Sequence, residues 1–197
     1  MGGMRIAVTG THGSGKTTLI DDFVDQHADY ERELEPYWAL AQDGIPFADG
    51  ASLPDLEQQL AASAQLILAR AGTPDVIFDR SPLDFIAYLE VVSEDEGLEW
   101  EPSGRLLGQI EKALATLDLL VFLPLSNPDE VRVPIELPRL RARVDRRLKA
   151  ILREDALELL ADGPKVLELS GSRAQRLATL DRAVKSAYVL AAQQASR

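Results

Sequence analysis

The sequence predicts a doubly wound α/β fold, with helices on both faces of a five-stranded parallel sheet. Short apolar segments alternate along the chain with longer segments that have helical periodicity. The apolar segments lack the polar alternation of a solvated strand, so we expect strands that are buried on both sides, as in parallel sheets. A glycine-rich loop joins the first strand to the first helix, and its context also favours this fold class.

The first half of the chain supplies three strands and two helices. Arg5-Ile6-Ala7-Val8-Thr9 has the pattern of a buried strand, and the residues after the glycine-rich loop continue with helical spacing. Gly72-Thr73-Pro74 ends a long helix, and the apolar segment that follows closes on an acid, Asp79. The expected order is strand 5–9, helix 16–27, strand 30–34, helix 54–71 and strand 75–79.

The second half supplies two further strands and four helices. Ser81 is the expected N-cap of the first helix, with Pro82 in the first turn and Asp84 reaching back. Leu140 opens an apolar stripe that recurs every four residues, which indicates an amphipathic helix. The expected order is helix 82–92, helix 102–116, strand 117–123, helix 139–160, strand 165–169 and helix 173–194. Irregular segments are expected at residues 41–53, 94–103 and 125–138.

Length and composition predict one compact domain over residues 1–197. The chain has 197 residues, of which 46% are hydrophobic, and this content suffices for a sizeable core. It contains no cysteine, which excludes disulfides, thiolate metal sites and a thiol nucleophile. No apolar window is long enough to span a bilayer, and the N-terminus has no signal-peptide pattern. We therefore expect a soluble, cytoplasmic protein without a membrane partner.

The charge distribution argues against a binder of nucleic-acid polymers. The net charge is −11, and a negative field repels polyanions. Residues 139–153 nevertheless carry seven basic residues and one acid, Asp145. A basic island in an acidic protein is either a local anion site or a solvated helix face, and the glycine-rich loop favours the anion site.

The glycine-rich loop has the most specific pattern in the chain. Gly10-Thr11-His12-Gly13-Ser14-Gly15-Lys16-Thr17 matches G-x-x-x-x-G-K-[ST] at every fixed position. In such a loop, backbone N–H groups surround phosphate oxygens, the lysine reaches the terminal phosphates, and the last hydroxyl joins a Mg²⁺ shell. We therefore expect a three-layer P-loop NTPase fold that binds ATP and Mg²⁺. The expected nucleotide-binding residues are Gly10, Thr11, His12, Gly13, Ser14, Gly15, Lys16, Thr17 and Thr18.

Two residues at the end of the third strand carry further chemistry. Asp79 stands where a P-loop protein places a carboxylate to hold Mg²⁺, so Thr17 and Asp79 are the expected metal ligands. Arg80 follows, and an arginine suits a substrate oxygen or a transferred phosphate better than it suits the activation of water. Ser126-Asn127-Pro128-Asp129 lacks the lysine of a guanine-binding sequence, so a GTPase switch is disfavoured.

Four places in the chain resemble the small P-loop kinases, particularly the deoxynucleoside kinase and thymidylate kinase branch and the NadR-like kinase (AAA ATPase-like) domains. These places are residues 10–17, Glu35-Pro36-Tyr37-Trp38, Asp79-Arg80-Ser81 and the arginine-rich helix that begins near Arg139, which is similar to their lid. The resemblance implies an ATP- and Mg²⁺-dependent kinase with a helical lid at about residues 125–160. The chain departs from the deoxynucleoside kinases at Asp79, where they usually have glutamate.

The resemblance also implies roles for single residues. Glu35 would accept the proton of an attacking hydroxyl, and Arg80 would position that carboxylate or bind the acceptor. Lys16 would hold the phosphates, and Arg143 or Arg147 would close from the lid and neutralise charge on the moving phosphoryl group. These five residues are the candidate catalytic residues.

Several assignments stay open in the sequence. Glu33 shares a strand face with Glu35 and rivals it as the base. Gln58 and Gln59 are candidates for reading a base through a side-chain amide, although surface glutamines on helices are common. With only two histidines in the chain, a zinc site is disfavoured.

The main hypothesis is a kinase whose acceptor is a small molecule, and the expected acceptor is a nucleoside or a nucleotide. A homodimer is allowed by the sequence but not required. The alternative hypothesis is a regulatory P-loop ATP-binding protein or ATPase that acts through a protein partner, with the basic helix as its docking surface.

Overall fold

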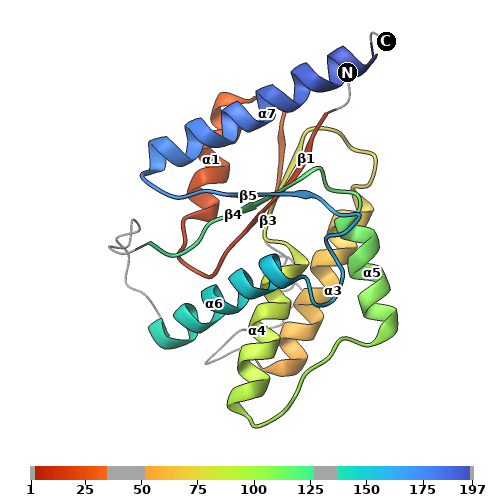
Figure 1. Cartoon of the computed structure of the whole chain (residues 1–197), viewed down its shortest axis with the longest axis vertical. Coiled ribbons are helices and arrows are strands. Elements are labelled where there is room, and N and C mark those ends of the chain that lie inside the picture. Colours follow the sequence, from red (N-terminus) through yellow and green to blue (C-terminus); the bar gives the residue numbers. More distant parts are fainter. Residues whose placement is uncertain (1–2, 35–51, 127–136, 196–197) are drawn as a thin grey trace.

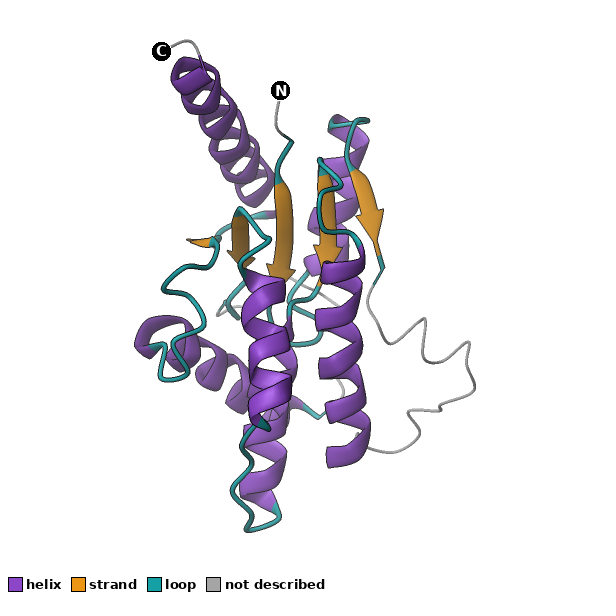
Figure 2. Ribbon diagram, turned by 90° about the vertical axis from the view of Figure 1, so that its right-hand side faces the viewer, coloured by secondary structure: helices purple, strands orange, loops and turns teal. Residues whose placement is uncertain are grey.

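Five strands form one sheet in the computed structural model, which describes residues 3–34, 52–126 and 137–195. β1 (Arg5–Thr9) lies at the centre, and the strand order is β2-β3-β1-β4-β5. The other strands are β2 (Glu31–Glu33), β3 (Val76–Asp79), β4 (Leu119–Phe122) and β5 (Lys165–Glu168). Every pairing is parallel, so the carboxyl ends of all strands meet at one edge of the sheet (Figure 2).

Helices cover both faces of this sheet (Figure 1). One face carries α1 (Lys16–Gln26) and α7 (Arg173–Ala195), and the other carries α3 (Leu53–Ala69), α4 (Pro82–Asp95) and α5 (Gly104–Leu114). α6 (Pro138–Glu154) packs against α4. None of the helices in the described ranges is long and apolar enough to cross a membrane. The predicted α/β fold, with a parallel sheet between two helical layers, is confirmed.

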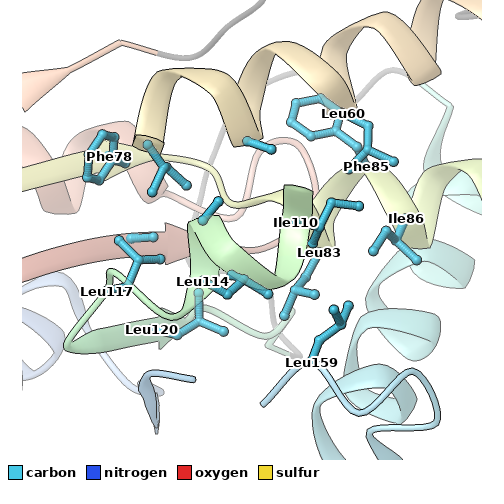
Figure 3. Packing of buried hydrophobic residues seen from close by; sticks show 14 of the residues in the cluster. Leu60, Phe78, Leu83, Phe85, Ile86, Ile110, Leu114, Leu117, Leu120 and Leu159 are labelled. Carbon is cyan, nitrogen blue, oxygen red and sulfur yellow. The ribbon is translucent and has the colours of Figure 1, made fainter. Parts of the chain in front are cut away.

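Side-chain alternation along β1 divides the core into two halves. Ile6 and Val8 pack with α1 and α7, whereas Ala7 packs with α3, α4 and α5. Figure 3 shows the second half, where Phe78 and Leu114 lie between the sheet and the helices. β1, β3 and β4 are buried throughout, but most residues of β2 and β5 are exposed. The expectation that every strand is buried on both sides is therefore wrong for the two edge strands, because the helices cover the centre of the sheet.

The basic helix α6 ends earlier than its sequence pattern predicts. The prediction extended it to residue 160, but it stops at Glu154, and Asp155 adopts a left-handed conformation with φ 44°. The Asp155 carboxylate then accepts the backbone N–H groups of Leu159 at 2.8 Å and Leu160 at 3.0 Å. A side chain that binds nearby backbone N–H groups competes with the helical ladder, so the apolar residues after Asp155 form a turn.

Candidate active site

A cavity of about 280 Å³ opens at the carboxyl edge of the sheet, beside the loop between β1 and α1. Its lining residues are His12, Gly13, Gly15, Lys16, Thr17, Thr18 and Arg80. Six of these seven residues come from the glycine-rich loop and the start of α1, and the seventh follows β3 directly. The sheet order explains this convergence, because β1 and β3 are neighbours and their carboxyl ends lie side by side.

Glycines allow the loop to turn tightly around this cavity. Gly10, Gly13 and Gly15 have φ values of 154°, 65° and 92°, a region that side-chain-bearing residues rarely adopt. At Gly10 a Cβ atom would also lie only 2.8 Å from the carbonyl oxygen of Leu123 and from Ser14 Oγ. The loop can therefore bring its backbone against the residue that follows β4 only with glycine at this position.

Lys16 lies on the inner side of the loop. Its ammonium group donates hydrogen bonds to the carbonyl oxygens of Gly10 at 2.9 Å and Thr11 at 3.0 Å, and the side chain is buried. Lys16 is also the first residue of α1, whose N-terminus carries a partial positive charge. The cavity thus combines a lysine with a helix N-terminus, which is a favourable setting for an anion.

Thr17 and Asp79 lie together at the same edge. The Thr17 hydroxyl donates to Asp79 Oδ2 at 2.7 Å, and Asp79 is 4% exposed. A hydroxyl and a carboxylate are oxygen ligands of the kind that Mg²⁺ prefers, and Mg²⁺ usually combines one or two such ligands with phosphate oxygens and water. The pair fits a Mg²⁺ ion in chemistry. Within the described ranges, no cluster of three or more acids or histidines offers a dedicated metal cage.

Arg80 reaches the cavity from a strained backbone. Its φ of 86° is unusual for a residue with a side chain, and such strain gathers at functional sites. The guanidinium donates to the Gly10 carbonyl oxygen at 3.4 Å and lies 3.6 Å from Asp84 Oδ1. It also lies 5.8 Å from the ring centroid of Phe85 and 5.9 Å from that of Tyr88. These contacts hold a second cation beside Lys16 at the cavity.

Comparison with known proteins identifies the family. A family model described as an AAA domain matches residues 5–176. The chain belongs to this AAA domain family. No curated protein sequence matches the chain.

Solved structures with a similar fold include two kinases. A deoxyadenosine kinase from M. mycoides with bound dATP is 14% identical with a TM-score of 0.62, and the match covers 91% of this chain and 98% of that chain. A thymidylate kinase from Candida albicans is 17% identical with a TM-score of 0.60, covering 95% of this chain and 93% of that chain. These matches confirm the predicted resemblance to the P-loop deoxynucleoside kinase and thymidylate kinase branch, at the level of the fold.

In this AAA domain, α4 holds the glycine-rich loop from behind through Asp84. Asp84 is fully buried, and it accepts the backbone N–H of Gly10 at 2.8 Å and the Thr9 hydroxyl at 2.5 Å. It also accepts the backbone N–H of Ser81 at 2.9 Å, which is the capping contact that the sequence predicts. The contacts with Thr9 and Gly10 were not predicted, because the pattern Ser-Pro-Leu-Asp indicates a helix start and nothing about the loop.

Two arginines that the sequence analysis did not single out hold the outer carbonyl oxygens of the loop. Arg141 of α6 donates to His12 at 2.8 Å and to Gly13 at 2.9 Å, and Arg176 of α7 donates to Ser14 at 3.0 Å. Both guanidinium groups are buried. The spacing of Arg141 with Val144 and Leu148 is a signal that could have found it, because these residues share the buried stripe of α6.

The predicted lid arginines face α4 instead of the loop. Arg143 forms ion pairs with Asp95 and, at 2.9 Å, with Glu94. Arg147 lies 3.5 Å from Glu90 and 3.8 Å from Glu94. Asp95 and Glu94 raise the pKa of Arg143 by accepting hydrogen bonds from its guanidinium. Contact of either arginine with a phosphate therefore stays a prediction, and it requires that these ion pairs break.

The residues predicted for the acceptor are only partly described. Glu35 lies outside the described residues, together with Tyr37 and Trp38. Glu33, its rival as the base, forms an ion pair with Arg70 at 2.8 Å, and burial raises the pKa of its carboxyl group. Gln58 is exposed, so of the two glutamines only Gln59, which is buried on α3, is enclosed by the protein.

Proposed function

We propose that this AAA domain is an ATP- and Mg²⁺-dependent kinase that transfers the γ-phosphoryl group to a small acceptor. The observation that carries the proposal is the arrangement around one cavity of Lys16, the paired Thr17 and Asp79, and Arg80. Phosphoryl transfer needs positioned positive charge more than covalent chemistry, because charge spreads over the oxygens of the moving group. This cavity offers two side-chain cations and a pair of oxygen ligands.

Each residue of the cavity has a separate role in such a transfer. Backbone N–H groups of residues 13–18 and the Lys16 ammonium bind the β- and γ-phosphates. Thr17 and Asp79 hold Mg²⁺, which supplies charge neutralisation on the phosphate oxygens when it is bound. The bond between the γ-phosphorus and the ADP oxygen breaks while a bond to the acceptor oxygen forms, and the acceptor proton passes to a carboxylate. Glu35 is the candidate for that carboxylate, and Arg80 orients the acceptor or the γ-phosphate.

A nucleoside or nucleotide is the acceptor class that we propose. Two structures of the similar fold are described as a deoxyadenosine kinase, one with dATP and one with the products dCMP and dCDP, and a third is a thymidylate kinase. Gln59 supports this class, because a buried amide on α3 can pair with the edge of a base. The alternative, a regulatory ATP-binding protein, is tested by the same experiment.

The experiment measures phosphorylated product by mass spectrometry after incubation with ATP, Mg²⁺ and a panel of nucleosides and nucleoside monophosphates. We expect one class of acceptor to gain a phosphoryl group. Lys16→Ala should abolish the product, and Lys185→Ala should not, because Lys185 is exposed on α7 and pairs with Asp181. ATP binding without any acceptor-dependent ADP release across the panel would favour the regulatory alternative.

A further inference from the structure

The Tyr88 hydroxyl binds three groups of the glycine-rich loop. It accepts the backbone N–H of His12 at 3.1 Å, and it lies 2.6 Å from His12 Nδ1 and 3.2 Å from Thr11 Oγ1. Tyr88 stands one helical turn after Asp84 on α4, so the same face of α4 holds the loop twice. The family pattern of the loop explains neither His12 nor Tyr88, because it leaves the third position of the loop unspecified.

The distances around this hydroxyl indicate where the hydrogens lie. A separation of 2.6 Å is shorter than the usual range of N–H donors and lies within that of O–H donors, which favours the Tyr88 hydroxyl as the donor to His12 Nδ1. The phenol oxygen then accepts from the His12 backbone N–H and from the Thr11 hydroxyl. A neutral imidazole that accepts at Nδ1 carries its hydrogen on Nε2. With the Tyr88 hydroxyl as the donor, the Nε2–H tautomer of His12 fits this network.

His12 lines the same cavity as Lys16 and Arg80. We propose that the Nε2–H of His12 donates a hydrogen bond to an oxygen of a bound polyphosphate, and that Tyr88 is the positioning residue that keeps His12 in this tautomer. The proposal rests on the proposed function in taking a polyphosphate as the ligand of the cavity. Lys16 and Arg80 already supply positive charge at the cavity. Two further charged groups contact the loop itself, the Arg141 guanidinium from α6 and the Asp84 carboxylate from α4. In this tautomer, Nε2–H adds a directed donor to the two side-chain cations of the cavity.

The tautomer can be measured directly, because the chain has only two histidines. Nitrogen-15 NMR of histidine-labelled protein distinguishes Nδ1–H from Nε2–H, and His27→Asn assigns the remaining signal to His12. We expect the Nε2–H form for His12 in the wild-type protein and a mixture of tautomers in Tyr88→Phe. A His12 signal in the Nδ1–H form, or one that Tyr88→Phe leaves unchanged, would overturn the role of Tyr88. Tyr30→Phe is the matched control, because it removes a buried tyrosine hydroxyl that binds Tyr188, far from the loop.

The phosphate contact is tested with a non-hydrolysable ATP analogue and Mg²⁺. Glutamine places an amide N–H near the position of Nε2, whereas asparagine places one near Nδ1. We therefore expect His12→Gln to bind within roughly 3-fold of the wild type and His12→Asn to bind roughly 10-fold more weakly, the size of one hydrogen bond to a charged group. The analogue should also shift the His12 signal and leave the His27 signal in place.

The outcomes separate this proposal from the proposed function. Equal affinity of His12→Asn and the wild type would overturn the phosphate contact, while binding and its dependence on Lys16 would still support the phosphate site. If the wild-type protein bound no nucleotide, the proposed function and the phosphate contact would both fail. The tautomer of His12 is measured by NMR without ligand. The NMR result would therefore still decide whether Tyr88 positions His12. Because His12 is only partly buried, its two variants are expected to fold even if Tyr88→Phe does not.

Discussion

The Asp84 carboxylate accepts the backbone N–H of Gly10 at 2.8 Å, although 74 residues separate the two in the chain. Through this bond the first turn of α4 holds the first glycine of the loop. Asp84 is fully buried, and its other bonds go to Thr9 and Ser81. One side chain thus joins the end of β1 to the start of α4.

Asp84→Ala should strongly destabilise the protein. The change leaves the buried N–H groups of Gly10 and Ser81 without their acceptor, and losing such a network costs about 3 kcal/mol. Asp55→Ala is the matched control, because Asp55 occupies the same position in the capping box of α3 at a more accessible site. We expect a loss of about 1 kcal/mol there. Urea denaturation measures both, and equal losses would contradict the bracing role of Asp84.

Arg141→Ala should weaken nucleotide binding while the fold is retained. Without the guanidinium, the carbonyl oxygens of His12 and Gly13 lose their donor, and the loop can leave the conformation that surrounds a phosphate. We expect the Kd for ATP to rise roughly 10-fold, as for the loss of one to two hydrogen bonds. Arg146→Ala, an exposed position on the same helix, should leave the Kd unchanged. Isothermal titration calorimetry measures both affinities.

Arg143→Ala tests the arginine that the family resemblance predicts for phosphate contact. Its result can be compared with that of Arg141→Ala, because Arg141 is the arginine of α6 that contacts the loop. If Arg143 acts only through Glu94 and Asp95, its loss should leave ATP affinity and turnover close to those of the wild type. Partly exposed ion pairs of this kind add only about 0–1 kcal/mol to stability. A large fall in turnover without a change in ATP affinity would instead show that α6 moves and brings Arg143 to the transferred phosphate.

Thr17→Ala should raise the Mg²⁺ concentration needed for half-maximal turnover. The variant removes a hydroxyl that donates to Asp79 and is placed to join the metal shell. We expect an increase of about 10-fold or more, which is typical for losing a group at a metal site. Ser186→Ala is the control, because it removes an exposed hydroxyl on α7 whose partner is the carbonyl oxygen of Arg182. Similar Mg²⁺ dependence in the two variants would count against Thr17 as a ligand.

Glu90→Gln should change the pH dependence of stability. Burial raises the pKa of the Glu90 carboxyl above its usual value of 4.5, while Arg147 partly opposes the rise. The folded protein therefore holds this proton more tightly than the unfolded chain, so the contribution of Glu90 is present below pH 4.5 and is lost as the pH rises through the raised pKa.

Glutamine cannot ionise. Above the raised pKa of Glu90, Glu90→Gln should therefore be more stable than the wild type, and this difference in stability should shrink as the pH falls toward 4.5. Denaturation at several pH values measures this difference. Glu111→Gln, an exposed change on α5, serves as the control and should show no such trend. A constant difference across the range would mean that ionisation of Glu90 is not its cause.

The local chemistry of the sequence determined the parallel α/β fold and the glycine-rich loop after its first strand. The alternation of apolar segments with helical segments predicts the fold, because the hydrophobic periodicity of a segment reflects which of its side chains are buried. The loop could be recognised from the sequence because its pattern requires glycine and lysine at fixed positions, and all of these positions are local in the chain. Asp79 was also predictable, since it ends a buried strand next to β1.

Only the tertiary structure decided which residues support that loop. Asp84, Tyr88, Arg141 and Arg176 reach it from three helices, and their sequence separations from it range from 74 to 162 residues. Composition did show that residues 139–153 are basic, but the direction of each arginine depends on how α6 rotates against α4. That rotation is set by the burial of Val144 and Leu148 against Val91 and Phe122, and it turns Arg141 toward the loop and Arg143 toward the acids of α4. Long-range packing is a property of the whole core, so the spacing within α6 could indicate that Arg141 is buried but not which groups it contacts.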